Sequence, residues 1–196
     1  RLWQQHFGRG LAANTSDFGS LGDKPTHPEL LDWLAATFVE NGWSLKKMHR
    51  LMVTSATYRM QSEIENPSSN IQKALLADPE NMFLWHHPSR RLDAEQVRDA
   101  LLAASGELNL KTGGAGEDGA KSVRRSVYLK VMRNKPDAVL AAFDAPDRIS
   151  HMPQRSVTTT ATQSLLLLNS DWARQRAAAF ALRLHKLHPG DASAQV

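Results

Sequence analysis

Four arginines and one aspartate in the C-terminal half of the chain have types and spacing that could do chemistry. They are Arg124, Arg125, Arg133, Asp144 and Arg155. Guanidinium groups hold carboxylates through paired, charge-assisted hydrogen bonds. Because these residues stand directly beside apolar sequence, we expect Asp144 to gather the arginines into a structural cluster next to the core. An arginine left unpaired in that cluster would instead bind a carboxylate or sulfate ligand.

The same cluster leaves a catalytic alternative open. A carboxylate surrounded by guanidinium groups has a lowered pKa, whereas a general acid needs a raised one. We therefore expect Asp144 to be an arginine partner, and we assign no catalytic residue. The alternative is a hydrolase-like or anion-binding catalytic domain that uses Asp144 with Arg125, Arg133 and Arg155 in a cleft.

Metal and cofactor sites find little support in the sequence. The chain has no cysteine, which excludes disulfides, covalent c-type haem, iron–sulfur clusters and Cys-based zinc sites within it. His185 and His188 have a spacing that could hold a metal, but the commoner role of such residues is to interact with the dipole at a helix C-terminus. We predict no metal site and no cofactor in these residues.

Two further segments look like functional motifs but have simpler interpretations. Residues 113–116, Gly-Gly-Ala-Gly, lack the Gly-Lys-Ser/Thr ending of a phosphate loop, and residues 111–122 are predicted to form a mobile loop. The dense charges of residues 90–99 are predicted to form a solvated helix face with weak ion pairs.

Charge is spread unevenly along the chain. Residues 61–120 carry 5 Lys and Arg against 10 Asp and Glu, a net charge of −5, whereas residues 121–196 carry 12 against 5, a net charge of +7. A basic third makes a nucleic-acid-binding module the weaker alternative function. Its basic residues are not interleaved with aromatic residues that look exposed, so nucleic acid is not the expected partner. No apolar run approaches the roughly 20 residues that span a bilayer, so no membrane span is expected.

The hydrophobic periodicity predicts a mainly α-helical, single globular domain of about six helices over residues 1–188, with a frayed tail at 189–196. Residues 126–132 are the best candidate for a strand, and at most one short strand or hairpin is expected.

Helix ends are marked by capping residues. Thr26 is predicted to cap a helix that has Pro28 in its first turn, and Ser44 and Ser170 are predicted to cap two others. Asp93 begins a further helix with a capping box.

A leucine-rich helix is predicted over residues 159–168. The run 165–168 makes this helix apolar on every side and hence buried. Gln163 and Asn169 are expected to make polar contacts at its ends.

Several collinear runs resemble a planctomycete-specific domain of unknown function. The main ones are RLWQQHFGRGL at 1–11, PTHPELLDWL at 25–34, TSATYR at 54–59, RRLDAE at 90–95, RRSVY at 124–128 and RSVTTT at 155–160. The resemblance covers nearly the whole chain. Ala161 stands where the family pattern has proline, and Gln154 replaces one arginine of a common pair.

The resemblance implies a context rather than a reaction. Such domains lie at the C-terminal end of large exported proteins, behind a cytochrome c-type domain and a second domain of unknown function. It thus implies a periplasmic or otherwise extracytoplasmic location, haem in an upstream domain only, and neighbouring domains of the same polypeptide as partners. The chain has no initial methionine and no signal peptide, so we expect it to be the C-terminal part of a larger protein.

The leading functional interpretation is a non-catalytic structural or interaction domain of an exported, cytochrome-associated multidomain protein. It would dock neighbouring domains or present a surface to a redox or glycan-processing partner.

Overall fold

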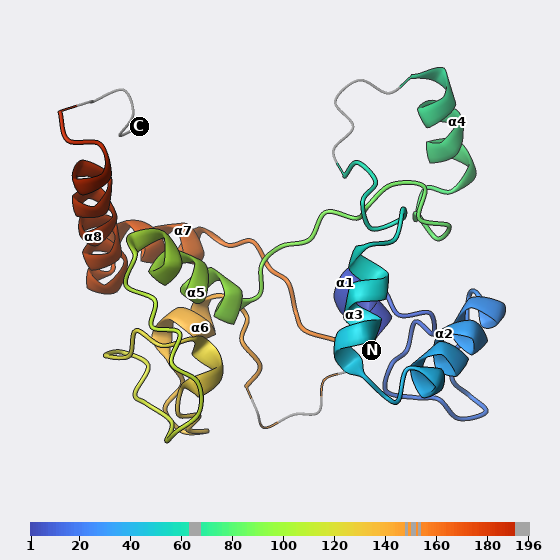
Figure 1. The fold of residues 1–196 in the computed structure, drawn as a ribbon, viewed down its shortest axis with the longest axis horizontal. Coiled ribbons are helices and arrows are strands. Elements are labelled where there is room, and N and C mark those ends of the chain that lie inside the picture. Colours follow the sequence, from blue (N-terminus) through green and yellow to red (C-terminus); the bar gives the residue numbers. More distant parts are fainter. Residues whose placement is uncertain (63–67, 148, 150–151, 153, 191–196) are drawn as a thin grey trace. The chain divides into compact units, whose positions relative to one another are not determined.

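The chain folds into two compact units, Arg1–Arg90 and Arg91–Val196, each with its own core (Figure 1). The computed structural model describes residues 1–62, 68–147, 149, 152 and 154–190. Within these residues there are eight α-helices, one 3-10 helix and no strand, which confirms the predicted mainly helical class. The domain prediction for 1–188 stays a prediction, and residues 191–196 of the expected frayed tail lie outside the described residues.

The first unit is built on α1 (Leu2–Phe7), α2 (Pro28–Glu40), α3 (Leu45–Val53) and α4 (Ser69–Ala77). Helix α1 packs against α3, as Figure 1 shows. The buried core of this unit consists of Phe7, Leu11, Leu34, Met48 and Met52. These side chains come from α1 to α3 and the loop after α1, whereas α4 contributes no buried residue.

The start of α2 differs from the prediction. Its N-cap is His27, not Thr26, and Pro28 occupies the first helical position. Thr26 instead donates its backbone N–H (2.8 Å) and its hydroxyl (3.2 Å) to the carbonyl of Leu11. The hydroxyl thereby fastens the loop after α1 to the start of α2. The predicted cap of α3 is confirmed, because Ser44 accepts a hydrogen bond from the N–H of Lys47.

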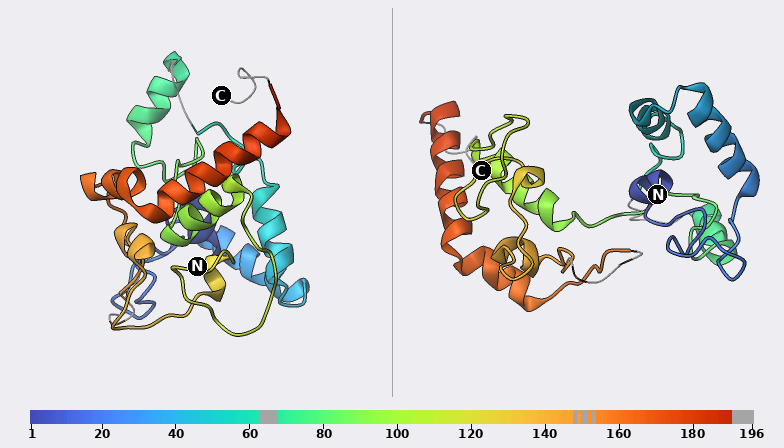
Figure 2. Two further views of the ribbon diagram at one scale, coloured as in Figure 1. Left: turned by 90° about the vertical axis from the view of Figure 1, so that its left-hand side faces the viewer. Right: turned by 90° about the horizontal axis from the view of Figure 1, so that it is seen from below.

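The second unit is organised around α5 (Ala94–Ser105). This helix packs against α8 (Asp171–Leu187), α6 (Ala138–Ala142) and the 3-10 helix η1 (Ser126–Tyr128), and α7 (Ala161–Asn169) packs against α6 and α8 (Figure 2). Its buried apolar core is formed by Ala94, Leu129, Val139, Leu140 and Phe143. The capping predictions hold here: Asp93 begins α5 with a capping box, and Ser170 caps α8.

The expected strand at 126–132 does not form. Ser126 donates its N–H (2.8 Å) and its hydroxyl (2.7 Å) to one carboxylate oxygen of Asp99, and these bonds hold the chain in the 3-10 turn. Only two isolated bridges, Asn109–Arg124 and Glu117–Leu129, occur in the described part of the chain. The β-branched and aromatic composition therefore marked a segment that packs on α5 rather than a sheet.

The leucine run is not buried on every side, contrary to expectation. Leu165 is 54% exposed and Leu168 is 71% exposed, while Leu166 packs against the core of the unit. Helix α7 contacts α6 and α8, which leaves the rest of its circumference uncovered. None of the described helices is long and apolar enough to cross a bilayer.

Candidate functional site

The centre of the second unit is a fully buried arginine. Arg98 has a relative exposure of 0%, although the sequence predicts a solvated face for this part of α5. Its Nη1 donates to the carbonyl of Arg124 at 2.9 Å, and its Nη2 donates to the carbonyl of Ser122 at 2.6 Å. Burial lowers the pKa of Arg98, and the carboxylates of Asp137 and Asp99 oppose this effect. The hydrogen bonds of Arg98 thus join α5 to the segment before η1.

Arg124 has a similar role in the loop that precedes it. Arg124 is 4% exposed, and its side chain lies over the ring of Tyr128, with 4.2 Å between Cζ and the ring centroid. The guanidinium donates to Glu117 Oε1 at 3.2 Å and to the carbonyls of Lys111, Gly113 and Ala115. The glycine-rich segment, predicted to be a mobile loop, is therefore wrapped around a buried guanidinium.

The other three arginines of the predicted cluster have surroundings different from those of Arg124. Arg155 forms a two-pronged ion pair with Glu95, with 3.0 Å between Nη2 and Oε1, and this pairing raises the pKa of Arg155. Arg125 is exposed, and its Nε lies 3.9 Å from an oxygen of Asp99. Arg133 is exposed and lies on the wall of a separate cavity of about 270 Å³.

Asp144 is held by a threonine rather than by these arginines. Its two carboxylate oxygens accept the backbone N–H and the hydroxyl of Thr158, both at 2.8 Å. These bonds, chiefly the one from the backbone, lower the pKa of Asp144, and the positive charge of Arg91 adds to the effect. An ionised carboxylate fixed in this way accepts hydrogen bonds and has no proton to give as a general acid.

The two polar residues predicted at the ends of α7 have different surroundings. Gln163 is buried in the first turn, where its amide oxygen accepts hydrogen bonds from Arg91 Nη2 (2.6 Å) and from the N–H of Thr160 (3.2 Å). Its amide nitrogen donates to the carbonyl of Thr158 at 3.2 Å. Asn169 is the last residue of the helix and is exposed.

The space beside Asp144 is too small for a substrate. The cavity that Asp144 shares with Arg91 and Arg155 has a volume of about 10 Å³. A cavity needs about that volume to hold a single water molecule. Arg124, Arg125, Asp144 and Arg155 therefore each have a partner of their own, and they do not surround an open cleft.

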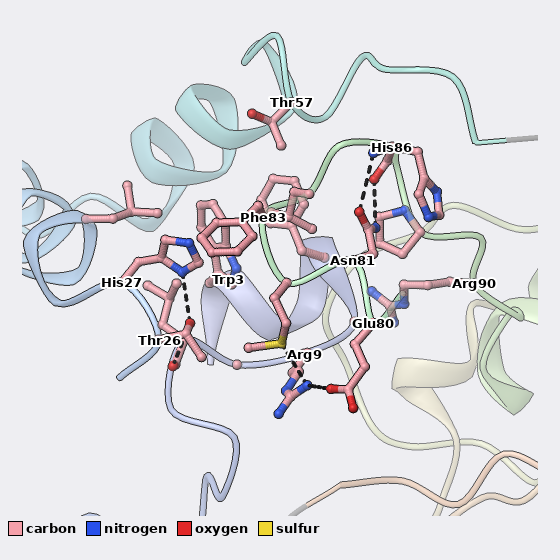
Figure 3. Close-up of a pocket in the computed structure, with 18 of the residues that line it drawn as sticks. Trp3, Arg9, Thr26, His27, Thr57, Glu80, Asn81, Phe83, His86 and Arg90 are labelled. Carbon is pink, nitrogen blue, oxygen red and sulfur yellow. Dashed lines mark hydrogen bonds and ion pairs between the residues drawn. The ribbon is translucent and has the colours of Figure 1, made fainter. Parts of the chain in front are cut away.

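A much larger pocket lies in the first unit, where the sequence pattern indicates no site. Its volume is about 600 Å³, and its walls come from α1, the loop after it, the start of α2 and residues 79–90. Figure 3 shows Trp3 and Phe83 near the middle of the pocket, His27 and Thr26 on one side and Arg90 on the other.

The rim of this pocket is a tight turn with unusual backbone angles. Asp78 accepts the N–H groups of Met82 and Phe83, both at 2.8 Å. Asn81, just before these two residues, and Leu84, just after them, each have a φ of +51°. A positive φ is tolerated by asparagine but is uncommon for a bulky residue such as leucine. The carboxylate of Asp78 therefore holds the turn in a conformation that its residues do not favour on their own.

The comparison with known families gives one result. A family model described as PSD1, protein of unknown function (DUF1553), matches residues 1–196. The chain belongs to the DUF1553 family. No curated protein and no solved structure matches it. Because the DUF1553 description names no activity, the function of this member has to be argued from its own residues.

A histidine pair joins α1 and α3 of this DUF1553 chain. His6 Nε2 and His49 Nδ1 are 2.8 Å apart and share a hydrogen bond. Burial, then His49 and then Arg90 lower the pKa of His6, which favours the neutral form of that ring. Among the residues that the structure describes, no three His, Asp or Glu side chains are arranged to hold a metal ion.

One signal in the sequence pointed to Arg98, the central arginine of this DUF1553 chain. Ala94, Arg98 and Leu102 are spaced by four residues, so they share one face of a helix, and all three are buried. Apolar neighbours on both sides of a charged residue along one helical stripe indicate burial of that charge. The pocket gave no such signal, because its walls come from segments far apart in the sequence.

Proposed function

We propose that this chain is a non-catalytic structural and interaction domain that docks a neighbouring domain of the same polypeptide. The larger protein would be an exported, cytochrome-associated multidomain protein of planctomycete type, with its haem in another domain. The observation that carries the proposal is an uncovered apolar groove on α8.

The groove runs along the outer side of α8 beside the end of α5 and has a volume of about 480 Å³. Leu182 is 62% exposed and Leu187 is 59% exposed in it. Contiguous exposed apolar side chains with a polar rim mark interaction surfaces. Burying these two leucines would remove apolar area from water and so favour docking.

The rim of the groove is basic. Arg183 donates to the carbonyls of Ala103 (2.9 Å) and Ala104 (2.7 Å), so its guanidinium closes the C-terminal end of α5. Lys186 also lines the groove, on the same helix. The expected partner surface is therefore apolar at its centre and acidic at its edge.

The size of the groove favours a tethered partner. Seven residues line it, whereas a stable complex of free proteins uses about 20–30 residues on each side. A covalently linked domain has a high effective concentration. It can therefore stay bound to a small surface from which a free partner would dissociate. A domain of the same polypeptide thus fits better than a freely diffusing redox or glycan-processing protein.

The surroundings of Asp144 support a non-catalytic role for the predicted arginine cluster. Asp144 is held ionised by Thr158, and the cavity beside it has a volume of about 10 Å³. A hydrolytic mechanism needs a carboxyl group able to give up a proton and room for a substrate.

Hydrogen exchange tests the docking proposal. The rates of the α8 amides are measured in this chain alone and in the full-length gene product. We expect slower exchange over residues 179–187 in the full-length protein. Leu182→Glu should abolish this protection, whereas Leu76→Glu, at an 84% exposed position of α4, should not. Equal exchange in both proteins, or a gene product without a further domain, would refute the proposal. A Cys-x-x-Cys-His segment and a signal peptide in that product would support the cytochrome context.

A further inference from the structure

We propose that the pocket of the first unit binds a small organic anion, a carboxylate carried on a flat aromatic body. This role is separate from the docking proposed for α8. The pocket volume of about 600 Å³ lies within the range of roughly 300–1,000 Å³ that is usual for small-molecule sites.

The walls of the pocket supply a surface for a flat apolar body. Trp3 stacks at a tilt on the core residue Phe7, with 4.1 Å between ring centroids, so its position is fixed from below. Phe83 also lies on the wall, where it is 76% exposed and its ring meets that of His27 edge-to-face, with 5.6 Å between the ring centroids. A large aromatic side chain left exposed on a pocket wall offers its face for stacking.

The turn that forms this wall is held by hydrogen bonds within the protein itself. Besides the two bonds from Asp78, the turn is held by Trp85, whose Nε1 donates to the carbonyl of Asp78 at 3.0 Å. Asn81 Nδ2 donates to the carbonyl of His86 at 2.9 Å. The left-handed residues Asn81 and Leu84 lie within this fastened turn. Backbone strain of this kind gathers at ligand-binding walls, where it fixes a shape that relaxed sequence would not keep.

The charge of the pocket selects an anion. Two arginines and one carboxylate line it, a formal charge of +1. Arg9 pairs with that carboxylate, Glu80, at 3.0 Å. Arg90 donates to the carbonyl of Gln5, and in the described part of the chain no Asp or Glu oxygen lies within ion-pair distance of it.

The positive charge of Arg90 also acts on two neighbouring histidines. After burial, Arg90 is the next cause that lowers the pKa of His87, and it also lowers the pKa of His6. A guanidinium has five N–H donors in a planar fork that matches a carboxylate. Arg90 therefore has donors left for a ligand, on the side of the pocket away from Thr26 and His27, with Trp3 and Phe83 near the middle (Figure 3).

The experiment compares two probes of the same shape, 2-naphthoate and the neutral 2-naphthamide. Their affinities for the whole chain are measured by isothermal titration calorimetry. We expect naphthoate to bind about tenfold more tightly than the amide, since one charge-assisted contact separates them. Arg90→Gln should remove this difference, whereas Arg59→Gln, an exposed arginine outside the pocket, should preserve it.

A second variant separates the aromatic wall from the charge. Phe83→Ala should weaken both probes by a similar factor of about three to ten, and its exposed position makes misfolding an unsatisfactory explanation. Equal affinities of the two probes in the wild-type chain would refute the choice of an anion. A lack of binding of either probe at millimolar concentration would refute the site itself.

Discussion

Thr158 donates both its backbone N–H and its hydroxyl to the carboxylate of Asp144, each at 2.8 Å. Asp144 has a φ of +63° just after α6, and Thr158 precedes α7. One side chain therefore joins the end of one helix to the approach to the next. Because the bonds favour the ionised form, they lower the pKa of Asp144.

This relationship predicts a loss of stability in acid. Since the pKa of Asp144 is lower in the folded state than in the unfolded state, its stabilising effect is fully present above the unfolded pKa of about 3.9 and is lost as the pH falls through the folded value. Asp144→Asn should flatten the dependence of the unfolding free energy on pH below about pH 4.

The loss of stability at neutral pH should be modest, because Thr158 is exposed and Asp144 is only half-buried. We expect Asp144→Asn to cost about 1 kcal/mol at pH 7 by urea denaturation. Thr158→Val, which keeps the backbone N–H, should cost less and retain the acid transition. An Asp144→Asn profile parallel to the wild-type profile down to pH 2 would contradict the assignment.

Arg98 is predicted to be the most costly residue to replace in the second unit. Arg98→Met removes the donors to the carbonyls of Ser122 and Arg124 and leaves them buried. The expected loss in unfolding free energy is about 3–5 kcal/mol. Arg125→Met is the matched control, since its side chain is 58% exposed, and it should cost about 0.5 kcal/mol or less. A loss below 1 kcal/mol for Arg98→Met would mean that the carbonyls find water instead.

Arg124 is predicted to control the order of the glycine-rich loop. Arg124→Leu should speed amide exchange and limited proteolysis at residues 111–117, because three carbonyls and Glu117 lose their donor. Arg133→Leu, an exposed arginine of the same predicted cluster, is expected to leave the loop unchanged. Unaltered exchange in Arg124→Leu would show that the loop holds its shape without the guanidinium.

Two glycines with left-handed backbones should respond differently to alanine. Gly106 ends α5 with a φ of +79°, and a Cβ placed there would lie 3.0 Å from Cδ of Arg183. Gly114 has a φ of +84° and open space around it. Gly114→Ala should cost about 1 kcal/mol from the backbone alone, and Gly106→Ala about 2 kcal/mol, because Arg183 must also move. Calorimetric melting curves compare the two, and equal losses would rule out the contact with Arg183.

Local features of the fold could be predicted because they depend on neighbours in the sequence. The cap of α3 by Ser44 and that of α8 by Ser170 involve bonds to residues three positions ahead, and the capping box at Asp93 does so too. The same reasoning misplaced the start of α2, because the hydroxyl of Thr26 donates its hydrogen bond to the carbonyl of Leu11, 15 positions earlier in the sequence.

For the arginine cluster, the sequence predicted burial next to the core but not the partner of each side chain. Composition indicated that arginines and core would meet, and Arg124 is indeed buried. It did not indicate which carboxylate each arginine takes. Arg155 pairs with Glu95, 60 residues away in sequence, and Asp144 accepts hydrogen bonds from Thr158. Such choices depend on which segments packing brings within about 3 Å, and several acids of similar chemistry compete for each guanidinium.

The sequence by itself thus determined the helical class, the starts of α3, α5 and α8, the family and the absence of cysteine chemistry. Only the tertiary structure decided that Arg98 is buried, that the leucines of α7 and α8 stay uncovered, and that a pocket forms between α1 and residues 79–90. The physical reason is the range of the interactions. Periodicity and capping act within a turn or two of helix, whereas burial and pocket walls depend on segments that the chain brings together from far apart.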